Sequence, residues 1–212
     1  MFGLDREIAS LASGRPLVAL AVALLLGLRH PLDPDHLAAV AAMARDSRRR
    51  SALIGLSWGA GHATTVVAVG VPVVLWTAAL PDNVHEVIEA VIGTVIFGLG
   101  LRLLVRHERG ELHSHPHRPS RSLREAYAVG VVHGAGGSAA IGLLILAAIP
   151  DHGVALAGLL VFAISTAVAM SAVAAGLGRG LRALPARPVG GLVCAFGVWY
   201  LAAAAAGAPY PF

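Results

Sequence analysis

The chain is short of charge, because only 13% of its 212 residues are Asp, Glu, Lys or Arg while 57% are hydrophobic. A soluble globular domain carries about 25% charged residues. Half of that share, gathered between long apolar runs, predicts a helical protein that spans a membrane several times. The composition excludes a soluble enzyme, a disordered chain and a collagen-like chain.

Cysteine and lysine are also scarce. The single cysteine, Cys194, excludes a disulfide framework, a thiolate zinc cage and a membrane redox carrier that uses a dithiol pair. All 16 basic residues are arginines, and they lie in short clusters beside apolar runs, where they act as a topology signal. With no nucleic-acid-binding motif in the chain, we expect no nucleic-acid partner. The chain also lacks a phosphate-binding loop, so it cannot use ATP by itself.

Six apolar runs are long enough to cross a bilayer, since a spanning helix needs about 20 apolar residues. They cover residues 16–44, 52–80, 87–105, 123–149, 153–178 and 188–206. We therefore expect an all-α, polytopic integral membrane bundle of six spans. The first run is interrupted by the charged segment 29–36, so seven segments with a re-entrant first pair are the main alternative.

Loop charge alternates along the chain. Arginines cluster at 45–50, 106–124 and 179–187, and acidic residues lie in the loops between these clusters. By the positive-inside rule the arginine clusters are cytoplasmic. We therefore expect a multi-pass protein of the cell (inner) membrane, with a cytoplasmic central loop and both termini outside.

Short motifs recur in the two halves of the chain. Gly27-x-x-His30 recurs 103 residues later as Gly130-x-x-His133, and a Gly-Leu and a Phe-Gly pair recur at a similar offset. A unit of three spans ends on the opposite side of the membrane from where it began, because three is an odd number. The second unit therefore begins on that opposite side and is inverted relative to the first. The pattern predicts a 3+3 inverted repeat. Its parts are a first three-span repeat (1–105), a His/Arg-rich cytoplasmic loop (106–122) and a second three-span repeat (123–212).

The first run holds five ionisable side chains within eight residues, 29–36. Each charge at the centre of a membrane costs at least about 2.5–3.5 kcal/mol on insertion scales, so such residues are functional candidates. Arg29 and Asp33 are four residues apart and could simply neutralise each other on a helix face. That pairing leaves three side chains unexplained: His30, Asp35 and His36.

Two prolines decide whether these three side chains can meet. On a regular helix His30, Asp35 and His36 point in different directions and could not share one ion. Pro31 and Pro34 each remove a backbone donor and clash with the preceding turn. Non-helical backbone at membrane depth is tolerated where it is buried or lines a cavity. We therefore expect an opened segment whose three polar side chains face one cavity.

Imidazole nitrogens with one carboxylate oxygen suit a borderline divalent ion such as nickel, cobalt or zinc, and the lack of thiolate argues against copper(I). The second run adds His62, which lies among small residues that allow helices to approach closely. A lone histidine on an apolar helix is more often a packed core residue. Because three candidate ligands lie one span away, we expect His62 to be a fourth metal ligand.

Further polar residues are expected along the ion path or behind the ligands. His133 occupies the repeat position of His30, and helix packing through a hydrogen-bonded histidine is the alternative for it. The others are Arg29, Asp33, Thr64 and Ser138. In the central loop, His113, His115 and His117 form a His-x-His-x-His pattern, which indicates transient capture of metal or, alternatively, a solvated polar linker.

Two of these segments carry a family resemblance. The stretch 29–37 resembles the His-x4-Asp-His signature of the nickel/cobalt transporter family, and 61–67 resembles its second, Gly-His-Ser-type signature. The resemblance covers roughly residues 20–80. It implies a secondary permease that recognises its ion through four residues: His30, Asp35, His36 and His62.

The second half departs from that family, which has eight spans and acidic signatures there. The corresponding stretch here, 132–139, carries no carboxylate. The chain therefore resembles a short relative, of the kind found as membrane proteins that accompany urease. A urease or other nickel-enzyme maturation system is the partner that this resemblance implies.

Together these observations predict a secondary transporter of a divalent transition-metal ion, nickel or else cobalt, that works in the lipid bilayer. We expect that it is not an enzyme and that it holds no prosthetic group, because the metal ion is its cargo. One alternative is a membrane protein that delivers metal to an enzyme such as urease or assists its assembly. A less favoured alternative is an intramembrane metalloenzyme. The spans hold only four histidines, too few for a histidine-box enzyme with two irons, and the chain has no His-Glu-x-x-His motif.

Overall fold

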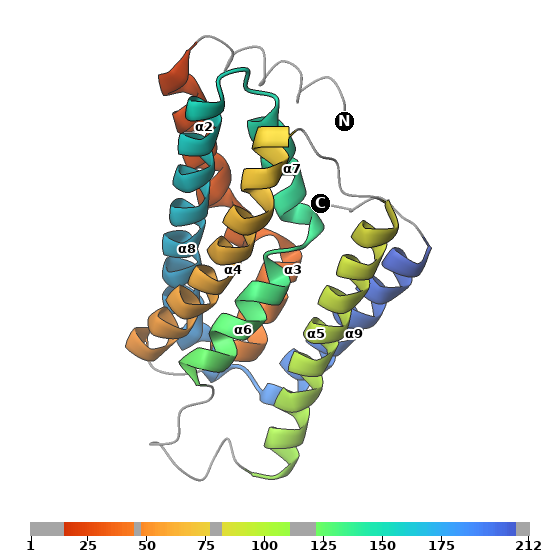
Figure 1. Cartoon of the computed structure of the whole chain (residues 1–212). Coiled ribbons are helices and arrows are strands. Elements are labelled where there is room, and N and C mark those ends of the chain that lie inside the picture. The colour runs from red at the N-terminus through yellow and green to blue at the C-terminus, as the bar shows by residue number, and fades with distance from the viewer. Residues whose placement is uncertain (1–14, 45–47, 77–81, 111–121, 207–212) are drawn as a thin grey trace.

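The computed structural model describes residues 15–44, 48–76, 82–110 and 122–206, and within them all regular structure is helical (Figure 1). The expected all-α class is confirmed. The elements are α2 (Pro16–Arg29), the 3-10 helix η1 (His30–Leu32), α3 (Pro34–Met43), α4 (Arg48–Trp76), α5 (Asp82–Glu108), α6 (Leu123–His133), α7 (Gly137–Ala147), α8 (His152–Ala183) and α9 (Ala186–Ala205).

Four of the described helices are long and apolar enough to cross a membrane: Arg49–Trp76, Val87–Glu108, His152–Gly178 and Ala186–Ala205. A fifth span results if the bent pair Pro16–Leu32 and Pro34–Met43, which is kinked by 54°, counts as one. These helices make the chain a membrane protein. The sequence break at 29–36 thus coincides with a real bend.

The expected span 123–149 is not one helix. It consists of α6 and α7, which have 11 residues each and are separated at Gly134–Gly136. Neither is long enough to cross a bilayer alone, since a span needs about 20 residues. The six expected spans are therefore not all present as continuous helices, because the break at Gly134–Gly136, which holds two glycines of low helix preference, interrupts the fourth.

Local signals explain where several helices begin. The hydroxyl of Ser122 accepts the backbone N–H of Glu125 at the start of α6, and the Glu125 carboxylate accepts the N–H of Ser122. Asp151 caps α8 by accepting the N–H of Val154 at 2.9 Å. After the break, α3 restarts at Pro34, where the missing N–H of proline costs no helical hydrogen bond.

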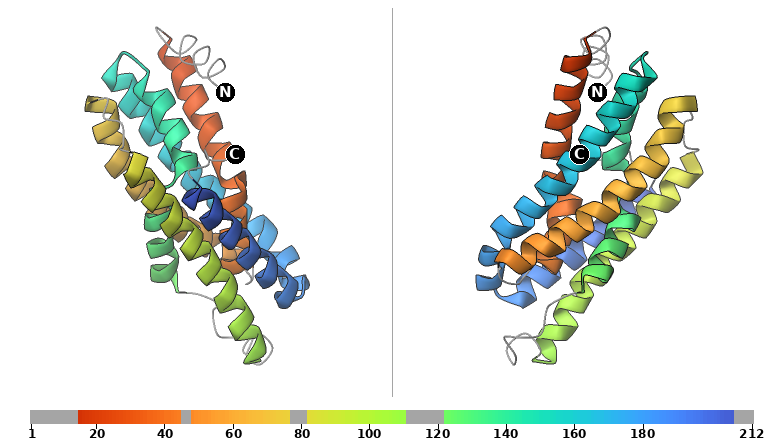
Figure 2. Two further views of the ribbon diagram at one scale, coloured as in Figure 1. Left: turned by 90° about the vertical axis from the view of Figure 1, so that its right-hand side faces the viewer. Right: turned by 60° about the vertical axis from the view of Figure 1, so that its left-hand side comes forward.

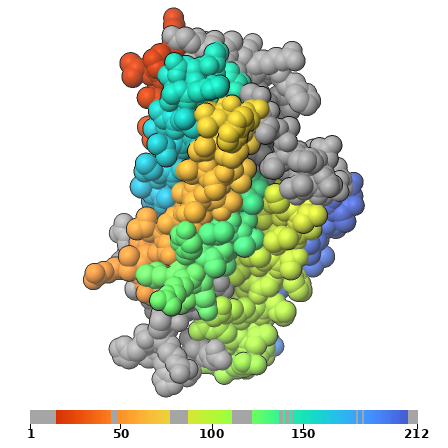
Figure 3. Space-filling view, viewed as in Figure 1, coloured from red at the N-terminus to blue at the C-terminus, as the bar shows by residue number. Residues whose placement is uncertain are grey.

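The helices pack in four extensive pairs: α4 along α8, α5 along α9, α6 along α4 and α2 along α8. Figure 2 shows the long helices running roughly along one axis, with α5 and α9 side by side. Figure 3 shows α4, α6 and α5 next to one another on one face. Large apolar side chains such as Leu17, Ile164 and Leu192 are exposed on the outside, as expected for a surface that lipid covers.

Glycines let these backbones approach closely. A Cβ on Gly130 of α6 would lie 2.0 Å from the carbonyl oxygen of Trp58 in α4, and one on Gly27 of α2 would lie 2.7 Å from that of Phe162 in α8. Real Cβ atoms do not come this close to other atoms, so neither contact would exist with a larger residue. Both contacts lie at the level of the polar cluster described next.

Candidate metal centre

Five buried polar side chains meet where the first span is broken. His30 begins η1, Asp35 and His36 lie in the first turn of α3, His62 lies midway along α4, and His133 is the last residue of α6. Each is at most 3% exposed. The prolines of the broken segment thus bring the three polar side chains of 29–36 into one buried place, as the sequence predicted.

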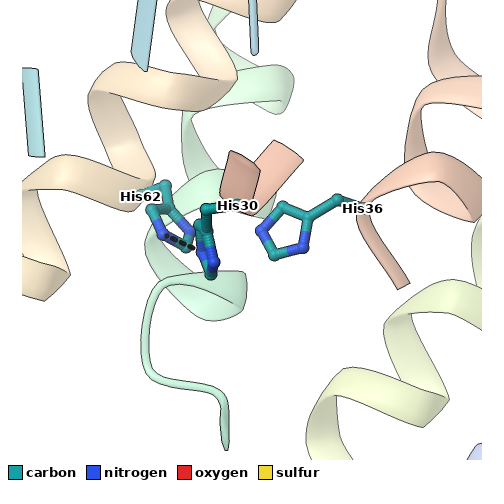
Figure 4. Close-up of side chains that lie close together, drawn as sticks. All are labelled: His30, His36 and His62. Carbon is teal, nitrogen blue, oxygen red and sulfur yellow. Dashed lines mark hydrogen bonds between the residues drawn. The ribbon is translucent and has the colours of Figure 1, made fainter. Parts of the chain in front are cut away.

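Three of the imidazoles face one another. His30 Nε2 lies 3.1 Å from His62 Nε2, and the ring centroid of His36 lies 4.4 Å from that of His30 and 5.3 Å from that of His62. Figure 4 shows the three rings converging from three separate segments. One ligand atom from each falls within 4.8 Å of the others, which is close enough to hold a metal ion.

Asp35 connects this group to the second half of the chain. Its Oδ1 lies 3.0 Å from His36 Nδ1, and its Oδ2 lies 3.2 Å from His133 Nε2. The rings of His36 and His133 are 4.8 Å apart. Asp35, His36 and His133 therefore form a second group whose ligand atoms lie within 4.8 Å of one another. His36 belongs to both groups.

Arg29 and Asp33 lie beside His30. The Arg29 guanidinium, which is largely exposed, pairs with the buried carboxylate of Asp33 at 3.3 Å. The other oxygen of Asp33 lies 3.3 Å from His30 Nδ1. A carboxylate at Nδ1 fixes the orientation of an imidazole and makes Nε2 the nitrogen that can bind a metal ion. The expected Arg29–Asp33 pair exists, and it also positions His30.

Several polar atoms of the cluster have no hydrogen-bond partner among the described residues. They are His36 Nε2, His62 Nδ1, His133 Nδ1 and the indole nitrogen of Trp58, all fully buried. A buried polar atom without a partner is costly, so natural proteins usually satisfy such atoms with a bound ion or water. Unpaired imidazole nitrogens beside a carboxylate are the donors that nickel, cobalt or zinc accept.

Other predicted residues lie elsewhere. Thr64 is exposed and donates its hydroxyl to the carbonyl of Ala60, at the α4–α6 contact with Tyr127, so the structure does not bring it into the cluster. The side chain of Ser138 lies outside the described residues, and so does the loop that contains the three expected capture residues, His113, His115 and His117.

Two aromatic residues of the site were not predicted. The Trp58 ring lies 5.4 Å from that of His36 and 5.8 Å from that of His133. The Phe162 ring lies 5.5 Å from that of His30. A signal for Trp58 was available, since it lies one helical turn before His62 and so on nearly the same face of α4.

The chain is similar to three known proteins, one of which is named as a nickel transport protein. Urease accessory protein UreH of Bacillus sp. (strain TB-90) is 26% identical over 164 residues, which cover 71% of this chain and 72% of that protein. High-affinity nickel transport protein of Cupriavidus necator is 39% identical over 93 residues, or 40% of this chain and 26% of that protein. Chloroplast protein FOR GROWTH AND FERTILITY 2 of Arabidopsis thaliana is 29% identical over 162 residues, or 68% and 42%.

The matched region thus spans less than half of the last two proteins. No protein-family model matches the chain, and no solved structure does. The predicted resemblance to nickel transporters and to a short urease-accessory relative is confirmed. The chain is a membrane protein similar to a urease accessory protein and to a nickel transport protein, and none of the three relatives is named as an enzyme.

Proposed function

We propose that the protein is a secondary transporter that carries Ni²⁺, or alternatively Co²⁺, across the cell membrane. In this proposal the ion is recognised by four residues: His30, Asp35, His36 and His62. The observation that carries the proposal is the group of three mutually facing, buried imidazoles at a break in a membrane helix. The similarity to the nickel transport protein supports nickel as the ion.

The depth of the site supports transport over binding at a surface. His62 lies 13 residues from the start of the span Arg49–Trp76 and 14 from its end. At about 1.5 Å per residue, both ends of the span are about 20 Å away. Secondary transporters bind their ions near the middle of the membrane, on broken helices, because the site must open to each side in turn.

The arrangement of the helices supports the 3+3 inverted repeat and six spans. In this repeat α2–α3 corresponds to α6–α7, α4 to α8 and α5 to α9. The packing of α6 on α4 then corresponds to that of α2 on α8, and the pairs α4 with α8 and α5 with α9 each join corresponding helices of the two halves. Along the chain, α2–α3 and α6–α7 run in opposite directions across the bundle (Figure 1). In this proposal the broken pair α6–α7 crosses the membrane as α2–α3 does.

Equivalent positions in the two halves also make equivalent contacts. Gly130 faces the α4 backbone at His62, and Gly27 faces α8 at Ser165. His62 and Ser165 are themselves 103 residues apart, the offset of the sequence repeat. The rest of the proposal is topology: the His-rich loop is cytoplasmic, where His113, His115 and His117 capture metal, and both termini lie outside.

A second candidate function is delivery of metal to an enzyme such as urease, without transport. The similarity to UreH over 71% of the chain favours it, because that protein is named as a urease accessory protein. The two candidates differ in what the purified chain can do alone. A transporter moves nickel into a sealed vesicle without any other protein, whereas a delivery protein does not.

The experiment is uptake of radioactive nickel into proteoliposomes that contain only this chain. We expect uptake above that of empty vesicles, and its loss in the variant His36→Ala, which removes the imidazole shared by both groups of ligands. His152→Ala is the matched control, because His152 is an exposed histidine at the start of α8. Absence of uptake with retained nickel binding would reject transport and leave metal delivery.

A further inference from the structure

The polar cluster offers two groups of ligands. The first, which we call the three-histidine position, consists of His30, His36 and His62, and the second, the Asp35 position, of Asp35, His36 and His133. Within each group the ligand atoms lie within 4.8 Å of one another. Metal–nitrogen bonds are about 2.0–2.1 Å long, so the ligands of one ion lie within roughly 4.2 Å of each other. Small movements therefore suffice to close either group around an ion.

The two positions lie side by side, because both include His36. The three-histidine position includes His62, whereas the Asp35 position lies beside Trp58, which packs on both His36 and His133. Trp58 precedes His62 by four residues, or about 6 Å along the axis of α4. Trp58 therefore flanks the Asp35 position, whereas His62 is itself part of the three-histidine position.

The side chains are arranged for the ion to rest first in the three-histidine position. Asp33 and Asp35 hold the Nδ1 atoms of His30 and His36, so Nε2 is the nitrogen through which each ring can bind an ion. His36 Nε2 has no partner among the described residues. An ion in the three-histidine position must displace one contact, the hydrogen bond of 3.1 Å between His30 Nε2 and His62 Nε2. An ion in the Asp35 position must displace two, because the carboxylate is engaged by both His36 and His133.

We infer that the cluster is a two-step relay in which one ion passes between the three-histidine position and the Asp35 position while His36 serves both. The ion exchanges His30 and His62 for Asp35 and His133. Two divalent cations a few ångströms apart in a buried site repel strongly, so the relay holds one ion at a time. His133 thereby becomes a ligand of the path, needed for passage and not for initial binding. This inference rests on the proposed function.

The relay separates binding from transport, and two alanine variants test the separation. In the full-length protein, Ni²⁺ binding is measured by calorimetry in detergent and Ni²⁺ uptake in proteoliposomes. We expect His62→Ala to weaken binding by about 10–100-fold, the usual cost of disturbing a metal site, and to lose uptake. We expect His133→Ala to bind one Ni²⁺ per chain within about threefold of the wild type, while its uptake falls about tenfold or more.

His133→Gln controls for packing, since it keeps a polar side chain of similar size in the same buried place. It should bind Ni²⁺ as His133→Ala does and show the same loss of uptake. His152→Ala should match the wild type in both measurements, because that histidine is exposed.

Three results would overturn the relay. Equal loss of binding in His133→Ala, His133→Gln and His62→Ala would mean a single coordination sphere. Full uptake in His133→Ala would mean that His133 only packs between helices. Two Ni²⁺ ions bound per wild-type chain, with the second lost in His133→Ala, would mean simultaneous occupancy. In all three the wild type still binds and takes up nickel, so the proposed function stands. A wild-type chain that neither binds nor transports Ni²⁺ would reject both.

Discussion

The substitution Gly130→Ala tests how closely α6 packs on α4. A Cβ at Gly130 would lie 2.0 Å from the Trp58 carbonyl oxygen, whereas real Cβ contacts below 3.0 Å essentially do not occur. The two helices must therefore separate by about 1 Å, since both contacting atoms belong to backbone or to Cβ and cannot rotate away. The hydrogen bonds from Ser57 to the carbonyl of Leu123 and from Thr65 to that of Val131, both 2.7 Å long, would stretch past hydrogen-bonding distance.

The expected cost follows from these changes. Overpacking a close contact costs about 1–3 kcal/mol, and each weakened hydrogen bond costs about 0.5–1.5 kcal/mol. Since part of the strain is relieved by the separation itself, we expect a loss of about 2–4 kcal/mol in the free energy of unfolding. For a chain of this size that corresponds to a fall in Tm of about 5–15 °C. Uptake should fall about tenfold or more, because ligands on α4 and α6 would move apart by about 1 Å.

The assay is thermal unfolding of the purified protein in detergent, followed by nickel uptake in proteoliposomes. Gly176→Ala is the matched control, because this glycine lies inside α8 and a Cβ there would have no neighbouring atom within 4 Å. Alanine is favoured over glycine in a helix interior by about 1 kcal/mol, so the control should be at least as stable as the wild type. A Gly130→Ala protein that unfolds at the temperature of the control would refute the close packing of α6 on α4.

Three further predictions concern the site and the topology. His30→Ala, Asp35→Ala and His36→Ala should each abolish uptake with near-normal expression, since removing an ionisable group from a span lowers the insertion cost; full uptake in any two of them would reject the site. Asp35→Asn, which keeps the shape and removes the charge, should also lose uptake, and measured uptake near the wild-type level would show that charge is not needed. In a Cys194→Ala background, a cysteine at Ser114 should resist an impermeant thiol reagent in intact cells, and rapid labelling would invert the expected topology.

Much of the site was predictable because its signals are local. Charged residues between apolar runs stand out along a chain, and Pro31 and Pro34 act on the turn in which they lie. The structure places the bend where these prolines predict it. It also buries each of the four expected metal ligands, since ionisable groups in an apolar bundle must turn inward.

The break between α6 and α7 was not predicted, and the reason is physical. The run 123–149 carries no Asp, Glu, Lys or Arg after Glu125 and no proline before Pro150, so hydropathy describes it as one span. The two glycines of the break, Gly134 and Gly136, have weak helix preference, and Gly134 packs closely on α4, since a Cβ there would lie 2.5 Å from the His62 carbonyl oxygen. Hydropathy measures transfer into lipid and carries no information on such a contact.

By itself, therefore, the sequence determined that the chain is a helical membrane protein and which polar residues lie at the break of the first span. Only the tertiary structure decided that Asp35 joins His36 to His133, which is 98 residues away, and that Thr64 points out of the cluster. The physical reason is that a contact between helices depends on their rotation and separation. Small residues on the facing helix, such as Gly130, set this rotation and separation, and the hydropathy of a single apolar run does not encode either quantity.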